Sequence, residues 1–255
     1  MRIFWIACRL LPVYVFLYLP LAVLITFSFN SSKYSTAWKG FTWKWYAKLA
    51  ANTQLVEAAL NSLTIATLAA SIASALGVLL AVALFRYRFK GRDLMQAGLF
   101  VLMMSPDIVM GVSLLLLFVA MGLNPGFWPL LTAHVTFCIP FVAATVYSRL
   151  KGFDPNLIEA AEDLGAGEFR TFRHVILPII MPAVLAGWLL SFTLSMDDVI
   201  ISFFVTGPDF EILPLRIFAM VKMGVKPDVN ALSAIMVGIT VCCVFVSHLL
   251  MRKRK

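Results

Sequence analysis

The chain has 255 residues, of which 61% are hydrophobic and only 13% are charged. Soluble domains usually carry about 25% charged residues, so the composition excludes an ordinary soluble protein. The net charge of +8 lies in short basic clusters between apolar runs, a pattern that orients membrane helices, so we expect no nucleic-acid partner. The sequence therefore predicts an all-α polytopic membrane protein with a single transmembrane domain over residues 1–255.

Apolar runs long enough to cross a bilayer predict six transmembrane helices. The first follows Arg2 and Arg9, and we expect it to stay uncleaved because it is long for a signal peptide and lacks a clear cleavage site. The predicted spans are 10–32, 58–85, two within 94–148 separated by a turn at 122–129, 175–204 and 231–250.

Small residues at four-residue spacing mark the second span. Ala66, Ala70 and Ser74 form one such series, and Ala73 and Gly77 form another. Small side chains let helix backbones approach closely in a membrane. We therefore expect this span to pack tightly against another helix.

The distribution of basic residues predicts that both termini are cytoplasmic. Six spans place the two termini on one side, and with that side inside, the inner segments hold 14 of the 21 Lys and Arg residues. Four lysines in the first external loop oppose this assignment. The same orientation places the polar segment 154–174 in the cytoplasm.

Tryptophan and tyrosine alternate with lysine in residues 33–57. One interpretation is a belt at the membrane interface, where aromatic side chains gather. The alternative is that Trp45 faces a translocation pathway and holds a cation against its ring. Both interpretations stay open at this point.

Three aspartates interrupt the predicted spans: Asp107, Asp197 and Asp198. A carboxylate at the bilayer centre costs roughly 2.5–3.5 kcal/mol, so such residues usually face a cavity or a partner. At about 1.5 Å per residue, Asp107 is expected about 16 Å into its span and Asp197 about 33 Å along its own. The two carboxylates are therefore predicted at different depths of one path.

The local sequence refines this prediction for each aspartate. Asp107 follows Pro106, which favours a kink, and a structural hydrogen bond is the alternative to a pathway role. Asp197 and Asp198 project about 100° apart, and we favour Asp197 for the lumen. No Lys or Arg lies within the spans to neutralise these charges, so a flexible polycation is the substrate that this pattern favours.

The sequence shows no sign of a metal site or of a nucleotide site. The four cysteines have no paired spacing, and His134 lies in an apolar run, where a hydrogen-bonding role is expected. No Gly-x-x-x-x-Gly-Lys-Ser/Thr motif is present. Any ATP-derived energy must therefore come from a partner protein, and we expect no catalytic residue, metal or cofactor in this chain.

The polar segment 154–174 is predicted to form two short helices. Pro155 suits a first helical turn, and Gly165 and Gly167 are expected to end that helix because glycine adopts turn conformations. A second short helix is expected over about 168–174. An amphipathic loop at the bilayer surface is the simplest interpretation of the composition.

The spacing within this segment supports a more specific interpretation. It resembles the EAA signature of ABC-importer permeases in Glu159-Ala160-Ala161, Gly165, Val175 and Leu177-Pro178, with valine where isoleucine is usual. Further runs resemble the polyamine (spermidine/putrescine) branch of these permeases: 29–32, 104–110, 134–138 and 191–198. The chain is thus similar to the membrane permease subunits of binding-protein-dependent ABC importers.

The resemblance implies a MetI-like ABC-importer permease fold in a bacterial inner membrane. It implies four kinds of partner: a second homologous permease, an ATPase dimer that binds the ATP and Mg, a periplasmic polyamine-binding protein, and the polyamine itself. It assigns ATPase coupling to Glu159, Ala160, Ala161 and Gly165. The substrate-pathway role of Asp107, Asp197, Asp198 and Trp45 is our inference from charge and depth.

Other functions were weighed against this one. Within the importers, ferric iron, thiamine or another amine is the alternative substrate. An intramembrane aspartyl protease lacks the expected Gly-x-Gly-Asp and Tyr-Asp motifs, since the aspartates here follow Pro106 and Met196. A stand-alone channel or carrier leaves the 154–174 segment unexplained.

Overall fold

The computed structural model describes the backbone of residues 2–32, 37–223 and 227–252, and the side chains of 9–32, 37–223, 227–238 and 241. This part of the chain is helical apart from loops and one isolated bridge between Asn30 and Phe41. It divides into two compact units. The first comprises Met1–Glu57 and Arg216–Lys255, and the second comprises Ala58–Leu215.

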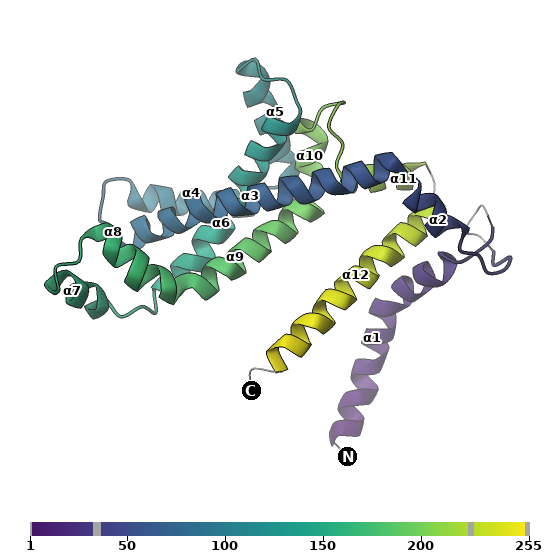
Figure 1. Ribbon diagram of the computed structural model, residues 1–255, viewed down its shortest axis with the longest axis horizontal. Coiled ribbons are helices and arrows are strands. Elements are labelled where there is room, and N and C mark those ends of the chain that lie inside the picture. Colours follow the sequence, from purple (N-terminus) through teal and green to yellow (C-terminus); the bar gives the residue numbers. More distant parts are fainter. Residues whose placement is uncertain (1, 33–36, 224–226, 253–255) are drawn as a thin grey trace. The chain divides into compact units, whose positions relative to one another are not determined.

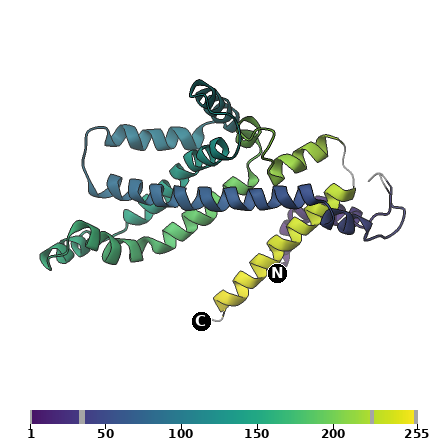
Figure 2. The ribbon, with the colours of Figure 1, turned by 45° about the horizontal axis from the view of Figure 1, so that its top comes forward.

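The first unit is built on the two terminal helices. Helices α1 (Arg2–Phe27) and α12 (Pro227–Arg252) lie side by side, and the short helix α2 (Lys44–Ala50) contacts α12. The first turn of α1 and the last turn of α12 lie at the same end of this unit (Figures 1 and 2). Most side chains of α1 from Leu10 to Leu19 are apolar and exposed, as expected for a helix in contact with lipid.

The second unit contains the central part of the chain. It holds α3 (Thr53–Arg86) from Ala58 on, α4 (Arg92–Met104), α5 (Asp107–Ala120), α6 (Phe127–Leu150), α7 (Asn156–Asp163), α8 (Glu168–Thr171), the π-helical turn η1 (Phe172–Ile176), α9 (Leu177–Asp197), α10 (Ile200–Val205) and the start of α11 (Leu213–Lys222).

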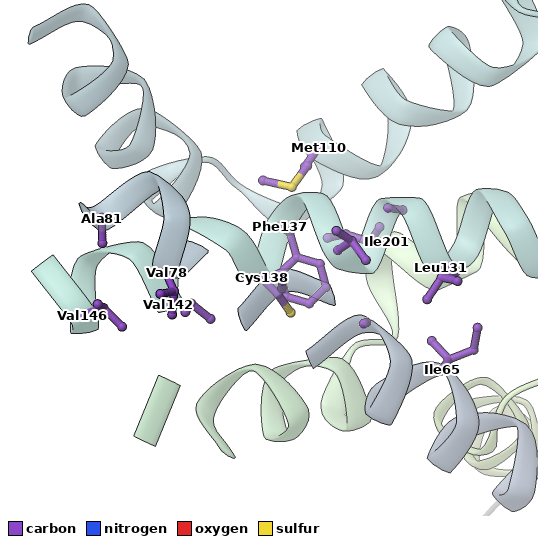
Figure 3. Close-up of a cluster of buried hydrophobic side chains, with 14 of the residues drawn as sticks. Ile65, Val78, Ala81, Met110, Leu131, Phe137, Cys138, Val142, Val146 and Ile201 are labelled. Carbon is purple, nitrogen blue, oxygen red and sulfur yellow. The ribbon is translucent and has the colours of Figure 1, made fainter. Parts of the chain in front are cut away.

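Helix α6 is the centre of the second unit. It contacts α4, α5, α9 and α10, and its residues dominate the buried apolar cluster (Figure 3). Leu131, Phe137 and Val142 of α6 lie in this cluster with Ile65 of α3 and Ile201 of α10. Because α6 carries apolar side chains all round, it fits a position enclosed by other helices.

Two glycines let neighbouring helices pack closely against Val142. A Cβ atom on Gly77 of α3 would lie 2.7 Å from the Val142 Cβ, and one on Gly187 of α9 would lie 3.3 Å from the Val142 Cα. Ala66, Ala70 and Ala73 are fully buried. The predicted tight packing of the second span is therefore confirmed.

Among the described residues, four helices are long and apolar enough to cross a membrane, and a fifth span results if α4 and α5 are counted together. These two helices are bent by 111° at Ser105–Pro106, which confirms the kink predicted at Pro106. The turn predicted at 122–129 is present but starts and ends slightly earlier, since α5 ends at Ala120 and α6 begins at Phe127. Helix α12 covers the sixth predicted span.

The prediction for the fifth span is wrong at both ends. The helix begins at Glu168, passes through η1 and ends at Asp197, whereas one continuous span over 175–204 was expected. Asp198 is extended (φ −69°, ψ 124°), and α10 then starts as a separate helix. The apolar run continues through this break, so hydropathy alone does not reveal it.

We expect Gly77→Ala to destabilise the protein because the added methyl group meets Val142 and the Ala143 backbone. The expected loss in the free energy of unfolding is about 1–3 kcal/mol, the usual cost of overpacking a protein interior. Gly98→Ala in α4 is the matched control, since a Cβ there meets nothing within 4 Å. Thermal unfolding in detergent, followed by size-exclusion chromatography, measures the difference. Equal midpoints for the two variants would contradict the close packing.

Candidate functional site

An acidic cavity of about 210 Å³ lies among α4, α5, α6, α9 and α10. Asp107 reaches it from the first residue of α5, Asp197 from the last residue of α9, and Asp198 from the break before α10. Apolar side chains complete the wall, and Met110, Phe137 and Ile201 are seen close together in Figure 3. The fold thus brings the three aspartates of the predicted spans to one place.

The structure brings together two aspartates that were predicted at different depths of one path. Counting along straight helices placed Asp107 near the bilayer centre and Asp197 near the outer surface, whereas both line the same cavity. The 111° bend lies immediately before Asp107, so this carboxylate starts α5 instead of continuing along the line of α4.

The carboxylate of Asp198 is already engaged by the protein. Its Oδ1 accepts the Ile201 N–H at 3.2 Å, and its Oδ2 accepts the Ser202 N–H at 2.8 Å and the Ser202 hydroxyl at 2.7 Å. These bonds cap the first turn of α10, as an acidic side chain does at a helix N-terminus. Asp198 therefore has a structural role besides lining the cavity.

Asp107 and Asp197 differ from Asp198 in both exposure and bonding. Both are exposed at the cavity, and within the described residues no hydrogen bond or ion pair engages either carboxylate. Two unneutralised carboxylates facing one space of this size attract a ligand with more than one positive charge.

His134 is fully buried on α6 behind this cavity. Its Nδ1 lies 2.7 Å from the Ser195 hydroxyl, and its Nε2 lies 2.9 Å from the Ser202 hydroxyl. The hydrogen-bonding role predicted for His134 is confirmed. Sequence reasoning missed Ser195 and Ser202, whose only signal was that they flank Asp197 and Asp198.

Neither the histidines nor the cysteines of the described residues assemble a metal site. No group of three His, Cys, Asp or Glu side chains in that part of the chain is placed to hold a metal ion. Cys138 is free and buried among apolar side chains of α6. The side chains of Cys8, Cys242 and Cys243 lie outside the described residues.

Trp45 lies on α2, in the first unit, and is not among the residues that line the acidic cavity. The indole is 8% exposed and donates its N–H to the Asn30 carbonyl at 2.7 Å. The ammonium groups of Lys44 and Lys48 lie 5.9 and 5.7 Å from the ring centroid. The ring thus has cations of this chain beside it, and a substrate contact for Trp45 stays a prediction.

Helix α7 ends in a well-formed glycine turn. Gly165 has φ +77°, its N–H donates to the Glu162 carbonyl at 2.8 Å, and the Ala166 N–H donates to the Ala161 carbonyl at 3.0 Å. This is the Schellman pattern, in which a left-handed glycine follows the helix end. The helix-ending turn predicted at Gly165 is confirmed, but Gly167 is extended and precedes α8 instead (φ −69°, ψ 166°).

Arg86, the last residue of α3, forms ion pairs with carboxylates on both sides of this glycine turn. Its guanidinium lies 2.5 Å from a carboxylate oxygen of Glu162 on α7 and 3.8 Å from one of Glu168 on α8. Nearby, the rings of Phe85 and Phe153 pack edge to face at 6.2 Å. One cation at the end of α3 thus pairs with both short helices of the segment, which we call the projection (residues 154–174).

The surface of this projection combines acidic and apolar groups. Glu159 and Ala160 are exposed and Ala161 is half-buried. Leu164 is 89% exposed and Phe169 is 72% exposed. Large apolar side chains that are this exposed to solvent on a polar segment are typical of a protein contact surface.

The sequence is similar to those of known membrane transport proteins. Residues 73–253 match the family model described as "Binding-protein-dependent transport system inner membrane component". The chain is 56% identical to the spermidine/putrescine transport system permease protein PotC of Escherichia coli K12, over 95% of this chain and 92% of that protein. It is 43% identical to the putrescine transport system permease protein PotI of the same strain, over 98% and 91%.

Solved structures of other transporters share the fold. A chain of a bacterial alginate ABC transporter, crystallised with an alginate pentasaccharide-bound periplasmic protein, is 18% identical and has a TM-score of 0.74, with 100% of this chain and 96% of that chain covered. At this identity, the similarity shows an all-helical membrane permease fold and nothing about substrate.

We expect Gly165→Ala to loosen the end of α7, because an L-residue in the left-handed conformation costs about 1–2 kcal/mol. Hydrogen exchange of the amides of 156–166 should then accelerate by roughly 5- to 30-fold. Gly167→Ala is the control, since its backbone is extended and a Cβ there meets nothing within 4 Å. Unchanged exchange in both variants would refute the Schellman turn.

Proposed function

Because this chain belongs to the family of binding-protein-dependent transport system inner membrane components, we propose that it is the permease subunit of a spermidine/putrescine ABC uptake system. It is a non-catalytic transport subunit with membrane-spanning helices, and the ATPase is a separate subunit. The observation that carries the substrate class is the acidic cavity, in which Asp107 and Asp197 are exposed without a described partner. The relatives PotC and PotI, named for polyamine transport, support the same substrate.

The charge pattern suits a polyamine better than the alternative substrates. Spermidine and putrescine are flexible chains with ammonium groups separated by methylenes, so they match separate carboxylates on an apolar wall. Ferric iron would need a set of oxygen or nitrogen ligands converging on one point, and the described residues offer no such set. Thiamine or another amine is the second candidate, favoured only by the same negative charge.

The proposed topology has six spans with both termini in the cytoplasm, in one MetI-like permease domain over residues 1–255. Counting the bent pair α4–α5 as one span and adding α12 to the other four helices gives six. The position of the first turn of α1 and the last turn of α12 at one end of the first unit supports an even number of spans.

The proposed assembly contains a second homologous permease, an ATPase dimer and a periplasmic polyamine-binding protein. The projection formed by 154–174 is the proposed contact with the ATPase, through Glu159, Ala160, Ala161 and Gly165. Its support is structural: the segment presents exposed acidic and apolar side chains, and Arg86 ties it to α3. A movement imposed on such an anchored projection is transmitted to the membrane helices instead of being absorbed by a loose loop.

In the proposed cycle, ATP-driven closure of the ATPases moves this projection and alternates the access of the cavity. The cavity carboxylates replace part of the hydration that a polyamine loses on entering the membrane helices. This replacement must remain incomplete, because binding that is too strong would prevent release. Two open carboxylates, with the third engaged by α10, meet that requirement.

Glu159→Arg is expected to reduce substrate-stimulated ATP hydrolysis of the reconstituted complex to its unstimulated rate, because a reversed charge opposes ATPase docking. Asp93→Arg is the control, since Asp93 is an exposed acid at the start of α4, outside the 154–174 segment. The ATPase rate is measured with and without loaded binding protein. Full stimulation of the Glu159→Arg complex would disprove the docking role.

Asp107→Asn and Asp197→Asn are each expected to lower uptake of labelled spermidine about tenfold, which corresponds to about 1.4 kcal/mol of lost charge interaction. Asp93→Asn, an exposed acid at the start of α4 that does not line the cavity, is the control. Uptake is normalised to the amount of assembled complex. Wild-type uptake by both cavity variants would remove the acidic cavity from the pathway.

A further inference from the structure

The break between α9 and α10 combines a local helix cap with contacts from elsewhere in the fold. Sharp interruptions of a helix usually occur at proline, at glycine, at a π-bulge or where a side chain inserts into the backbone ladder. From Trp188 to Thr206 the chain contains neither proline nor glycine, and the apolar run continues across Asp197 and Asp198. The local part of the cause is the Asp198 carboxylate, which caps the Ile201 and Ser202 amides. Contacts from other elements supply the rest.

His134 of α6 makes those contacts from both sides of the break. Ser195 belongs to the last turn of α9, and its hydroxyl lies 2.7 Å from Nδ1 of the imidazole. Ser202 belongs to the first turn of α10, and its hydroxyl lies 2.9 Å from Nε2. One rigid ring thus connects the end of one helix to the start of the next.

The hydrogen bonds form a directional chain that ends on Asp198. Since the Ser202 hydroxyl donates its proton to Asp198 Oδ2, it must accept one from Nε2–H of His134. In the neutral ring Nδ1 is then an acceptor, so it takes the proton of the Ser195 hydroxyl. Every member of this chain is satisfied by one tautomer, as a buried polar network requires.

The position of Asp197 follows from this chain. Asp198 is fixed by Ser202 and by the amides of α10, and Asp197 is the residue directly before it, at the end of α9. Without the imidazole, the two hydroxyls would lose their common partner, and only the Asp198 cap would oppose a continuous helix from 195 to 202. In a continuous helix Asp197 would leave its place at the cavity that it shares with Asp107.

We propose that His134 is a positioning residue for translocation: it holds the α9–α10 break open and so aims the Asp197 carboxylate into the acidic cavity. The proposal rests on the polyamine-transport function proposed above. His134 itself does not line the cavity, so it acts through Ser195, Ser202 and Asp198 and not by contact with substrate.

The test uses the complete complex of permeases, ATPase and binding protein in liposomes, and measures labelled spermidine accumulated per ATP hydrolysed. His134→Ala is expected to lower this ratio about tenfold, equivalent to about 1.4 kcal/mol, while ATP hydrolysis continues.

Ser202→Ala should lower the ratio of spermidine to ATP similarly. The double variant should transport no worse than His134→Ala alone, because both changes break the same chain. His134→Gln, which keeps an N–H donor, should recover part of the ratio.

Leu130→Ala is the matched control. Leu130 is fully buried on α6, one turn before His134, and does not line the cavity. It should lower thermal stability without changing spermidine transported per ATP in the assembled complex. If His134→Ala does not assemble, Ser202→Ala decides the question.

Two results would overturn the proposal: wild-type transport per ATP in His134→Ala or Ser202→Ala, or an equal loss in Leu130→Ala. A wild-type complex that accumulates neither spermidine nor putrescine would instead refute the proposed function on which this inference rests.

Discussion

Backbone amides and carbonyls in a hydrocarbon environment must find partners within the protein, and this constraint explains where the membrane helices of the second unit stop. Pro106 has no N–H to donate, and its carbonyl accepts the amides of Val109 and Met110 to start α5. At the second interruption, the Asp198 side chain accepts the amides of Ile201 and Ser202. Both interruptions open onto the acidic cavity, so the irregular backbone lies where polar groups have partners.

Helix α6 connects the two parts of the candidate site. Gly126, just before it, donates its N–H to the Val205 carbonyl at the end of α10, and the segment after its last residue leads into α7. Between these ends, Val142 is in close contact with α3 and α9 through Gly77 and Gly187. Closely packed helices transmit displacement because their interiors have little free volume to absorb it. In the proposed importer, this packing links the ATPase contact to the cavity.

Features set by single residues could be predicted from the sequence, whereas contacts between residues distant in sequence could not. The kink at Pro106, the turn before α6, the close packing of Gly77 and the left-handed Gly165 all follow from the conformational preferences of single residues, and all were predictable. The role of Gly167 was predicted wrongly, because a glycine permits a positive φ without requiring one. Arg86 was counted only as part of a basic cluster, although it pairs with Glu162 and Glu168 at a separation of more than 70 residues.

By itself, the sequence determined the all-helical membrane class, the approximate places of the long helices and the position of the polar segment 154–174, because hydropathy and glycine or proline preferences act over a few neighbouring residues. Only the tertiary structure decided that Asp107 and Asp197 share one cavity and that α9 ends at Asp197. The first depends on a 111° bend whose size no residue type encodes. The second depends on His134, which lies more than 60 residues earlier in the chain and reaches Ser195 and Ser202 only after α6 and α9 have packed together.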